Sequence, residues 1–262
     1  MRLSNGLALG YGVRGTGRPV TFLHPIGTRR TLWNGVIAHL QNEMCCICVD
    51  FRGHGESDVP GKPFSLDDLV DDVVELMHVR GMTNVVVVGC SMGGMVAQGV
   101  AGKVPELLSG LVLAGTSHAQ TAQSAQAMLQ RSEDALKGMP SVMQSTIERW
   151  FPEAFRGAQP QTVDEVRNWL LDDDPVVFSW GWRAIAQLDN TESLRKAKMP
   201  ALLVRGSLDA STAEERMRAM QSLLPRSTYL EMPGAGHLAP MEQPETFGSM
   251  LREFINRQVG QG

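Results

Sequence analysis

The chain has 262 residues, of which 43% are hydrophobic and 20% are charged, a balance typical of a folded globular protein rather than a disordered one. A formal net charge of −4 and the absence of a basic block give no electrostatic footprint for nucleic acid or an anionic membrane, so we expect neither partner. No apolar run approaches the roughly 20 residues that a membrane-spanning helix needs, and we expect a cytoplasmic protein with one sizeable core.

Five short apolar runs punctuate the chain, and each is continuous rather than alternating, as strands buried on both faces should be. They cover residues 20–24, 45–50, 85–89, 108–115 and 201–206, and a further strand is predicted at 227–232. Helical patterns lie between them at 31–41, 65–80, 92–103 and 212–223, and Ser65 with Asp68 forms a capping-box signature at the start of the second. This alternation predicts an α/β fold with a mostly parallel sheet.

The alternation breaks between residues 117 and 195, where the sequence carries helical periodicity and no convincing strand. The alternation of predicted strands and helices resumes after this stretch. The helical segment therefore interrupts one sheet rather than starting a separate domain. We therefore predict a helical cap at 117–195, inserted into a core formed by residues 1–116 and 196–262.

Residues 85–94 place a single serine in a turn between a predicted strand and a predicted helix. Their sequence, VVVVGCSMGG, contains the pattern G-x-S-x-G with Ser91 at its centre. A turn this sharp forces unusual backbone dihedrals on the serine and brings strand and helix close together, which explains the small residues on both sides. The turn also puts Ser91 at a helix N-terminus, where backbone amides favour negative charge. We predict that Ser91 is a nucleophile.

A serine hydroxyl is a weak nucleophile at neutral pH, so it needs a general base and an acid that orients the base. His237 lies in a glycine-rich loop after the predicted strand 227–232, at the sheet edge that also carries Ser91. Asp209 follows the preceding strand, and the chain order Ser91, Asp209, His237 is one that such triads use. The competing acid position, after the strand 108–115, has no carboxylate. The sequence thus predicts a catalytic triad.

Acyl transfer to such a serine also needs two backbone amides that bind the oxyanion. The expected donors are the amide of Met92, directly after the nucleophile, and the amide of Ile26, in the loop after the strand 20–24. His24 opens this loop beside Pro25, and we interpret it as structural rather than as a base. The sequence has no metal-ligand spacing and no phosphate-binding or dinucleotide glycine pattern, so we expect neither a metal nor a cofactor.

Five segments across nearly the whole chain resemble the successive signatures of the α/β-hydrolase family. They are LHPIGTRRTLW, VDFRGHGESD, VVGCSMGGMVAQ, LLVRGSLDAST and MPGAGHLAPMEQPE, in that order. The resemblance implies an eight-stranded, mostly parallel sheet with a helical lid after the sixth strand, and a structural role for Arg52 and His54. Pro25 stands where many relatives carry glycine. Within the family, GCSMGGMVAQ and DFRGHGESDVP are similar to segments of 3-oxoadipate enol-lactonases and related small esterases and lactonases.

The expected function is that of a serine hydrolase that cleaves a small carboxylic ester or lactone through an acyl-enzyme. Trp150, Trp180 and Trp182 of the cap are expected to line the pocket, which would suit an apolar or aromatic acyl group. The arginines that could pair with a substrate carboxylate are Arg29, Arg149 and Arg183, and the sequence does not distinguish among them.

Two other functions fit the same residues. A carbon–carbon bond hydrolase or a perhydrolase would use the same triad. A ligand-binding receptor on this fold would keep the pocket but turn its ligand over slowly or not at all. Apolar residues of the cap could equally serve the mouth of the pocket or the interface of a homodimer.

Overall fold

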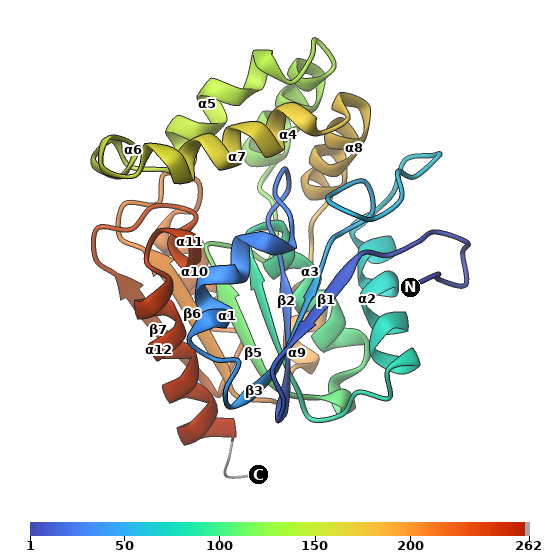
Figure 1. Cartoon of the computed structure of the whole chain (residues 1–262), viewed down its shortest axis with the longest axis vertical. Helices are drawn as coiled ribbons and strands as arrows, with labels where there is room; N and C mark the ends of the chain where they lie inside the picture. Colours follow the sequence, from blue (N-terminus) through green and yellow to red (C-terminus); the bar gives the residue numbers. More distant parts are fainter. Residues whose placement is uncertain (260–262) are drawn as a thin grey trace.

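The computed structural model describes residues 1–259, and its central element is a seven-stranded sheet (Figure 1). The strands are β1 (Tyr11–Arg14), β2 (Arg18–Leu23), β3 (Met44–Val49), β4 (Val85–Cys90), β5 (Leu108–Ala114), β6 (Ala201–Gly206) and β7 (Ser227–Met232). Their order across the sheet is β1-β3-β2-β4-β5-β6-β7, and of these only β1 runs antiparallel to its neighbour. The predicted mostly parallel α/β architecture is confirmed.

The strand count differs from the eight that the resemblance implied, because the described residues form seven strands. Residues 1–10 contribute only an isolated bridge between Arg2 and Ala8. The segment between them is a tight turn, in which the Gly6 N–H donates to the Leu3 carbonyl oxygen at 2.9 Å. At the other end, residues 260–262 of the predicted core lie outside the described residues.

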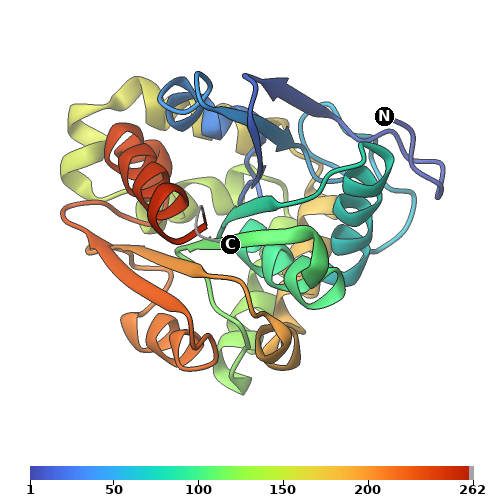
Figure 2. The same cartoon turned by 90° about the horizontal axis from the view of Figure 1, so that it is seen from below.

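Helices cover both faces of the sheet (Figure 2). One face carries α1 (Asn34–Ala38), which follows a 3₁₀ turn at Arg30–Trp33, and α12 (Pro244–Phe254) with its π-helical end at Ile255–Val259. The other carries α2 (Leu66–Val79), α3 (Met92–Lys103), α9 (Thr191–Lys196) and α10 (Glu214–Gln221). A 3₁₀ turn (Pro105–Leu107) precedes β5, and α11 (Ala239–Glu242) precedes α12. The four valines of β4 are fully buried between the two layers, as a continuous apolar run predicts.

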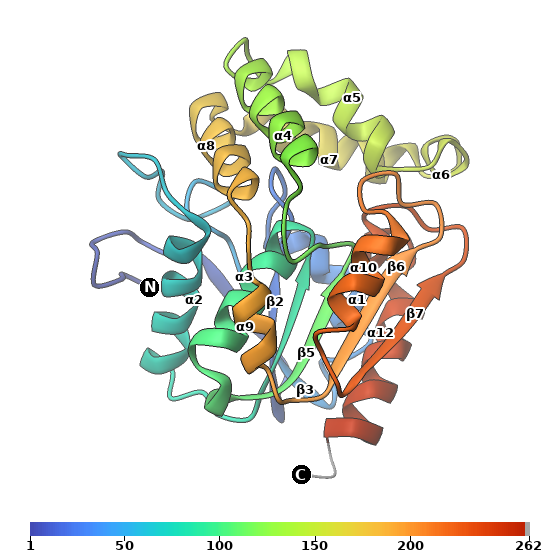
Figure 3. The ribbon, with the colours of Figure 1, turned by 180° about the vertical axis from the view of Figure 1, so that it is seen from behind.

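Five further helices form a layer over the carboxyl ends of the parallel strands, and we call this layer the lid (Figures 1 and 3). They are α4 (Ala122–Ala135), α5 (Pro140–Trp150), α6 (Glu153–Ala158), α7 (Pro160–Asp172) and α8 (Pro175–Ala186). Three of them begin with proline, whose missing N–H costs nothing in the first turn. All but the last residue of helix α9 falls in the range 117–195, but the helix packs against α3 on the core. In residues 1–259 no helix has the length and apolarity needed to cross a membrane.

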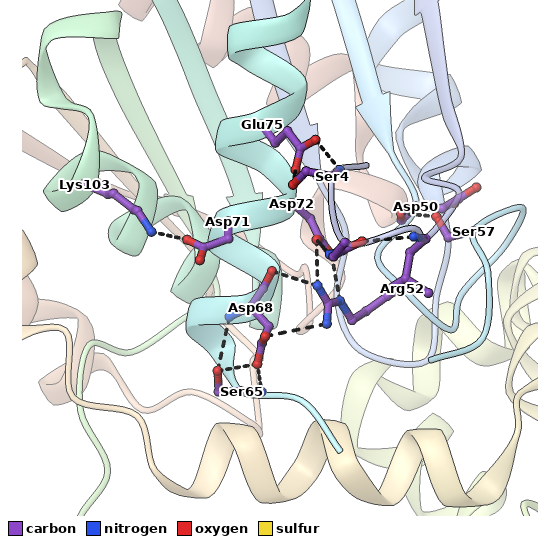
Figure 4. A network of polar contacts seen from close by, with 12 residues as sticks. Ser4, Asp50, Arg52, Ser57, Ser65, Asp68, Asp71, Asp72, Glu75 and Lys103 are labelled. Atoms are coloured by element: carbon purple, nitrogen blue, oxygen red, sulfur yellow. Dashed lines mark hydrogen bonds and ion pairs between the residues drawn. The ribbon is translucent and has the colours of Figure 1, made fainter. Parts of the chain in front are cut away.

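A buried ion pair ties the loop after β3 to α2 (Figure 4). Arg52 Nε and Nη2 donate to the two carboxylate oxygens of Asp72 at 2.7 and 2.6 Å, and Asp68 lies 3.8 Å away. Asp68 also completes the predicted capping box with Ser65 at the start of α2. The side chains of Arg52 and Asp72 are 8% and 1% exposed. Removal of either one would leave the other as an uncompensated buried charge, which would destabilise the fold. The loop that this pair anchors also carries His54.

We expect Asp72→Ala to lower the free energy of unfolding by about 3 kcal/mol or more, because it leaves the Arg52 guanidinium buried without a partner. The double variant Arg52→Met with Asp72→Leu should recover most of that loss. Urea denaturation measures both. The matched control is Asp71→Ala on the same helix, whose ion pair with Lys103 is exposed and should contribute less than about 1 kcal/mol. Equal losses for the two aspartates would contradict the expectation.

Candidate active site

Ser91 occupies the turn between β4 and α3 with φ 52° and ψ −119°. Among the described residues, only Asn84 shares a positive φ outside glycine. The Ser91 N–H donates to the Ala114 carbonyl oxygen at 2.9 Å, and its own carbonyl oxygen accepts from Thr116 Oγ1 at 2.8 Å. Strand β5 and the residues just after it therefore hold the strained serine from both sides.

Two glycines make this turn sterically possible. A Cβ atom on Gly93 would lie 2.1 Å from the carbonyl oxygen of Leu23 at the end of β2. A Cβ atom on Gly89 would lie 2.2 Å from the carbonyl oxygen of Gly93. The first turn of α3 thus approaches β2 and β4 more closely than any residue with a side chain would permit.

His237 and Asp209 form a buried pair on the loops that follow β7 and β6. His237 Nδ1 lies 3.1 and 3.0 Å from the two carboxylate oxygens of Asp209. Asp209 Oδ1 also accepts the amides of Ser211 at 2.7 Å and Thr212 at 3.0 Å. Burial alone would raise the pKa of Asp209, but His237 and these amides hold it below its ordinary value. An ionised Asp209 favours the tautomer with the proton on Nδ1, which leaves Nε2 free to accept one.

Ser91 and His237 line one small cavity, of about 40 Å³, beneath the lid. Its apolar wall consists of Ile26, Met95, Met128, Trp150, Trp182 and Ile185. Within residues 1–259 the Ser91 hydroxyl has no hydrogen-bond partner, and bonds between a nucleophile and its base often tighten only when substrate is bound. In that same range no three His, Cys, Asp or Glu side chains are placed to hold a metal ion.

The two expected oxyanion donors lie on the turns that flank this cavity. Met92 is the first residue of α3, so its N–H has no acceptor one turn back in the helix. Ile26 lines the cavity directly. In the same turn the Gly27 N–H donates to His54 Nε2 at 3.1 Å, and the Thr28 N–H donates to a carbonyl oxygen of the turn. The Ile26 N–H has no such acceptor in the described part of the chain.

Two buried histidines lock the turn after β2 to the segment after β3. The Phe51 N–H donates to His24 Nε2 at 3.0 Å, and the Gly27 N–H donates to His54 Nε2 at 3.1 Å. Both Nε2 atoms act as acceptors, so both rings are neutral. Burial lowers the pKa of His24 well below its ordinary value and lowers that of His54 to about 4. Neither ring lines the cavity of Ser91, and both hold the backbone around it.

The three tryptophans expected at the pocket do not gather in one place. Trp150 and Trp182 line the cavity of Ser91, and Trp150 lies 6.3 Å from His237 between ring centroids. Trp180 lines a separate pocket between the lid and the start of α2. Trp180 and Trp182 stand two residues apart on α8, and side chains at that spacing point in different directions.

Of the three candidate arginines, only Arg149 lines the cavity of Ser91. Arg29 lies over the ring of Trp169 at 5.6 Å, and Arg183 donates to Ser132 Oγ at 3.0 Å. The structure adds two arginines that the sequence analysis missed, Arg131 and Arg216, which line the same cavity. They could not be identified locally, because their position depends on how α4 and α10 pack.

Comparisons with known proteins place this chain among hydrolases. Residues 22–248 match a family model described as the alpha/beta hydrolase family. The chain is 29% identical to 3-oxoadipate enol-lactonase 2 of Acinetobacter baylyi, over 96% of this chain and 94% of that protein. It is 24% identical to the (E)-2-((N-methylformamido)methylene)succinate hydrolase of the same species, over 97% of each. The malate-bound structure of a thermophilic esterase from Thermogutta terrifontis matches with a TM-score of 0.91 and 29% identity, covering 98% of this chain and 96% of that one.

Gly89→Ala should destabilise the protein by several kcal/mol or prevent folding, because its new Cβ atom would overlap the Gly93 carbonyl oxygen. Gly157→Ala is the matched control, since it lies in α6 and a Cβ atom there meets nothing within 4 Å. The control should raise stability by up to about 1 kcal/mol. Thermal unfolding followed by circular dichroism compares the two, and a Gly89→Ala protein as stable as the wild type would refute the steric account.

Acid should destabilise the protein through His54. Its pKa is about 4 when folded against an ordinary value of 6.5, so between those values the unfolded chain binds a proton that the folded chain does not. The contribution of neutral His54 to the free energy of unfolding is complete above pH 6.5. It falls by about 3 kcal/mol as the pH drops toward 4. His54→Gln retains an acceptor for the Gly27 N–H and should lose less stability over that window. Urea titrations at pH 4 and at pH 6.5 test this, with the exposed His78→Gln as control. If the wild type and both variants lost the same stability in acid, His54 would be excluded as the cause.

Proposed function

Because the chain belongs to the α/β-hydrolase family, a family of hydrolytic enzymes in which its relatives include a lactonase and an esterase, we propose that it cleaves a small carboxylic ester or lactone with Ser91 as nucleophile. The observation that carries the proposal is the placement of Ser91 and His237 on one cavity, with His237 Nδ1 against the Asp209 carboxylate. Ester and lactone hydrolysis share one acyl-transfer chemistry, so the same groups serve both substrates.

In the first half of the proposed reaction, Ser91 Oγ forms a bond to the acyl carbon while its proton passes to His237 Nε2. The carbonyl oxygen takes up the electron pair and is held by the amides of Ile26 and Met92. Collapse of this intermediate breaks the bond to the leaving oxygen, which receives the proton from His237. Asp209 keeps the imidazole in the required tautomer and stabilises its charged form.

In the second half, a water molecule gives a proton to His237 Nε2 and attacks the acyl-enzyme. The carboxylic acid leaves, and Ser91 regains its proton. In a lactone the leaving oxygen stays attached to the acyl chain, so ring opening yields a single hydroxy or keto acid. Trp150 and Trp182 form the apolar wall that faces the acyl chain during both steps.

Ser91→Ala should lower kcat/KM for a short-chain p-nitrophenyl ester and for a simple lactone by at least about a thousandfold, since it removes the nucleophile. Steady-state rates and the pre-steady-state burst of p-nitrophenol measure this. The matched control is Ser109→Ala, because Ser109 lies on β5 at the far end of the sheet and donates to the Asn84 carbonyl oxygen. A Ser91→Ala protein with wild-type turnover would overturn the proposal.

The same experiment separates the other functions that fit this fold. A carbon–carbon bond hydrolase would leave both esters and lactones nearly untouched but cleave a vinylogous diketone in a Ser91-dependent way. A receptor would turn over nothing, while a ligand would still raise its melting temperature.

A further inference from the structure

Three arginines from three different helices line the cavity that contains Ser91. They are Arg131 on α4, Arg149 on α5 and Arg216 on α10. The first two belong to the lid and the third belongs to the core, so positive side chains of both layers meet at this cavity. The chain as a whole has a net charge of −4, so the local charge of these arginines is opposite in sign to that of the whole chain.

None of these three guanidinium groups pairs with a carboxylate among residues 1–259. Several other buried or half-buried arginines do have such partners. Arg52 binds Asp72 at 2.6 Å, and Arg205 binds Glu231 at 3.0 Å. The cavity arginines therefore differ from these two ion-paired arginines.

The contacts that the three arginines do make are with neutral groups. Arg149 Nη2 reaches Thr146 Oγ1 only at 3.5 Å, and the Arg131 guanidinium lies 5.0 Å from the ring centroid of Trp182. Arg216 Nη2 donates to Gln120 Oε1 at 2.9 Å. These contacts orient the side chains but leave their positive charge uncompensated.

The surroundings disfavour the charged form of each group. Burial lowers the pKa of Arg131 and of Arg216, and burial together with the neighbouring Arg131 lowers that of Arg149 to about 10. Like charges in a partly desolvated site repel one another, and an anion bound among them would remove this cost. Guanidinium groups suit a carboxylate in particular, because their planar N–H donors match its two oxygens.

We propose that Arg131, Arg149 and Arg216 form an anion subsite that selects esters or lactones carrying a free carboxylate besides the acyl group that Ser91 attacks. This inference rests on the function proposed above. The apolar wall around Trp182 fits a short hydrocarbon spacer between the two groups. Hydrolysis of such a substrate adds water across the acyl C–O bond and gives a product with two carboxylates. The acyl group thus has a charged end, instead of being wholly apolar as the tryptophans alone suggested.

The first test compares two substrates that differ only in charge. Mono-4-nitrophenyl glutarate carries a free carboxylate, and in methyl 4-nitrophenyl glutarate that carboxylate is capped. The wild type should show a kcat/KM about tenfold or more higher for the free acid, as expected when a charged group gains hydrogen bonds to a cationic site. Hydrolysis of both esters at equal kcat/KM would overturn the anion subsite and leave the hydrolase function standing.

The second test removes one charge at a time. Arg149→Met and Arg131→Met should each raise KM for the free acid about tenfold with little change in kcat, and should leave the capped ester unaffected. Arg149→Lys should recover part of the loss. Arg183→Met is the matched control, because Arg183 also lies on a lid helix but hydrogen-bonds Ser132 away from the cavity. Equal losses on both esters, or the same loss in the control, would overturn the proposal.

A binding measurement keeps the proposal testable even if no ester is cleaved. Glutarate should raise the melting temperature of the wild type and of Ser91→Ala, whereas dimethyl glutarate should not. Arg149→Met and Arg131→Met should abolish the glutarate shift. A shift without turnover would support the anion subsite while refuting the hydrolase function. Absence of any glutarate shift in the folded wild type would refute the subsite.

Discussion

At the first turn of α3, a helix and two strands approach so closely that no side chain fits between them. Gly93 meets the backbone of β2 there, and Gly89 meets the backbone of Gly93. The strained dihedrals of Ser91 follow from this contact, and hydrogen bonds from the neighbouring strand sustain them. The same geometry aims the Met92 amide outward at the helix terminus. The proposed nucleophile and the first of the proposed oxyanion donors are therefore set by one steric constraint.

The position of the second proposed oxyanion donor, the Ile26 amide, depends on the protonation of two histidines rather than on steric contact. Its turn is held by Gly27, which donates to His54, and its neighbouring segment is held by Phe51, which donates to His24. Both histidines must stay neutral to accept these bonds, and burial keeps them so. The buried ion pair of Arg52 anchors the same segment, so fold stability and site geometry are linked there.

Much of the core could be predicted, because its signals are local. The valines of β4 and the capping box of Ser65 each depend on a few adjacent residues. Asp209 and His237 could be assigned to one edge, because the carboxyl ends of parallel strands meet there. Strand β1 was missed because its four residues are half-buried at most and carry no continuous apolar run. Trp180 and Trp182 were grouped although they lie roughly 200° apart around one helix, a signal that the sequence did contain.

The charge of the cavity could not be predicted, because it arises only when lid and core are packed together. Arg131 and Arg149 come from the lid, Arg216 comes from the core, and the N-terminus of α3 adds its own positive potential at Ser91. Within the lid, Arg131 repels Arg149, whereas an anion bound among the three guanidinium groups would attract all of them. A neutral ester would meet the full repulsion. An ester with a free carboxylate would relieve this repulsion on binding, and the proposed selection of the substrate would rest on that electrostatic gain.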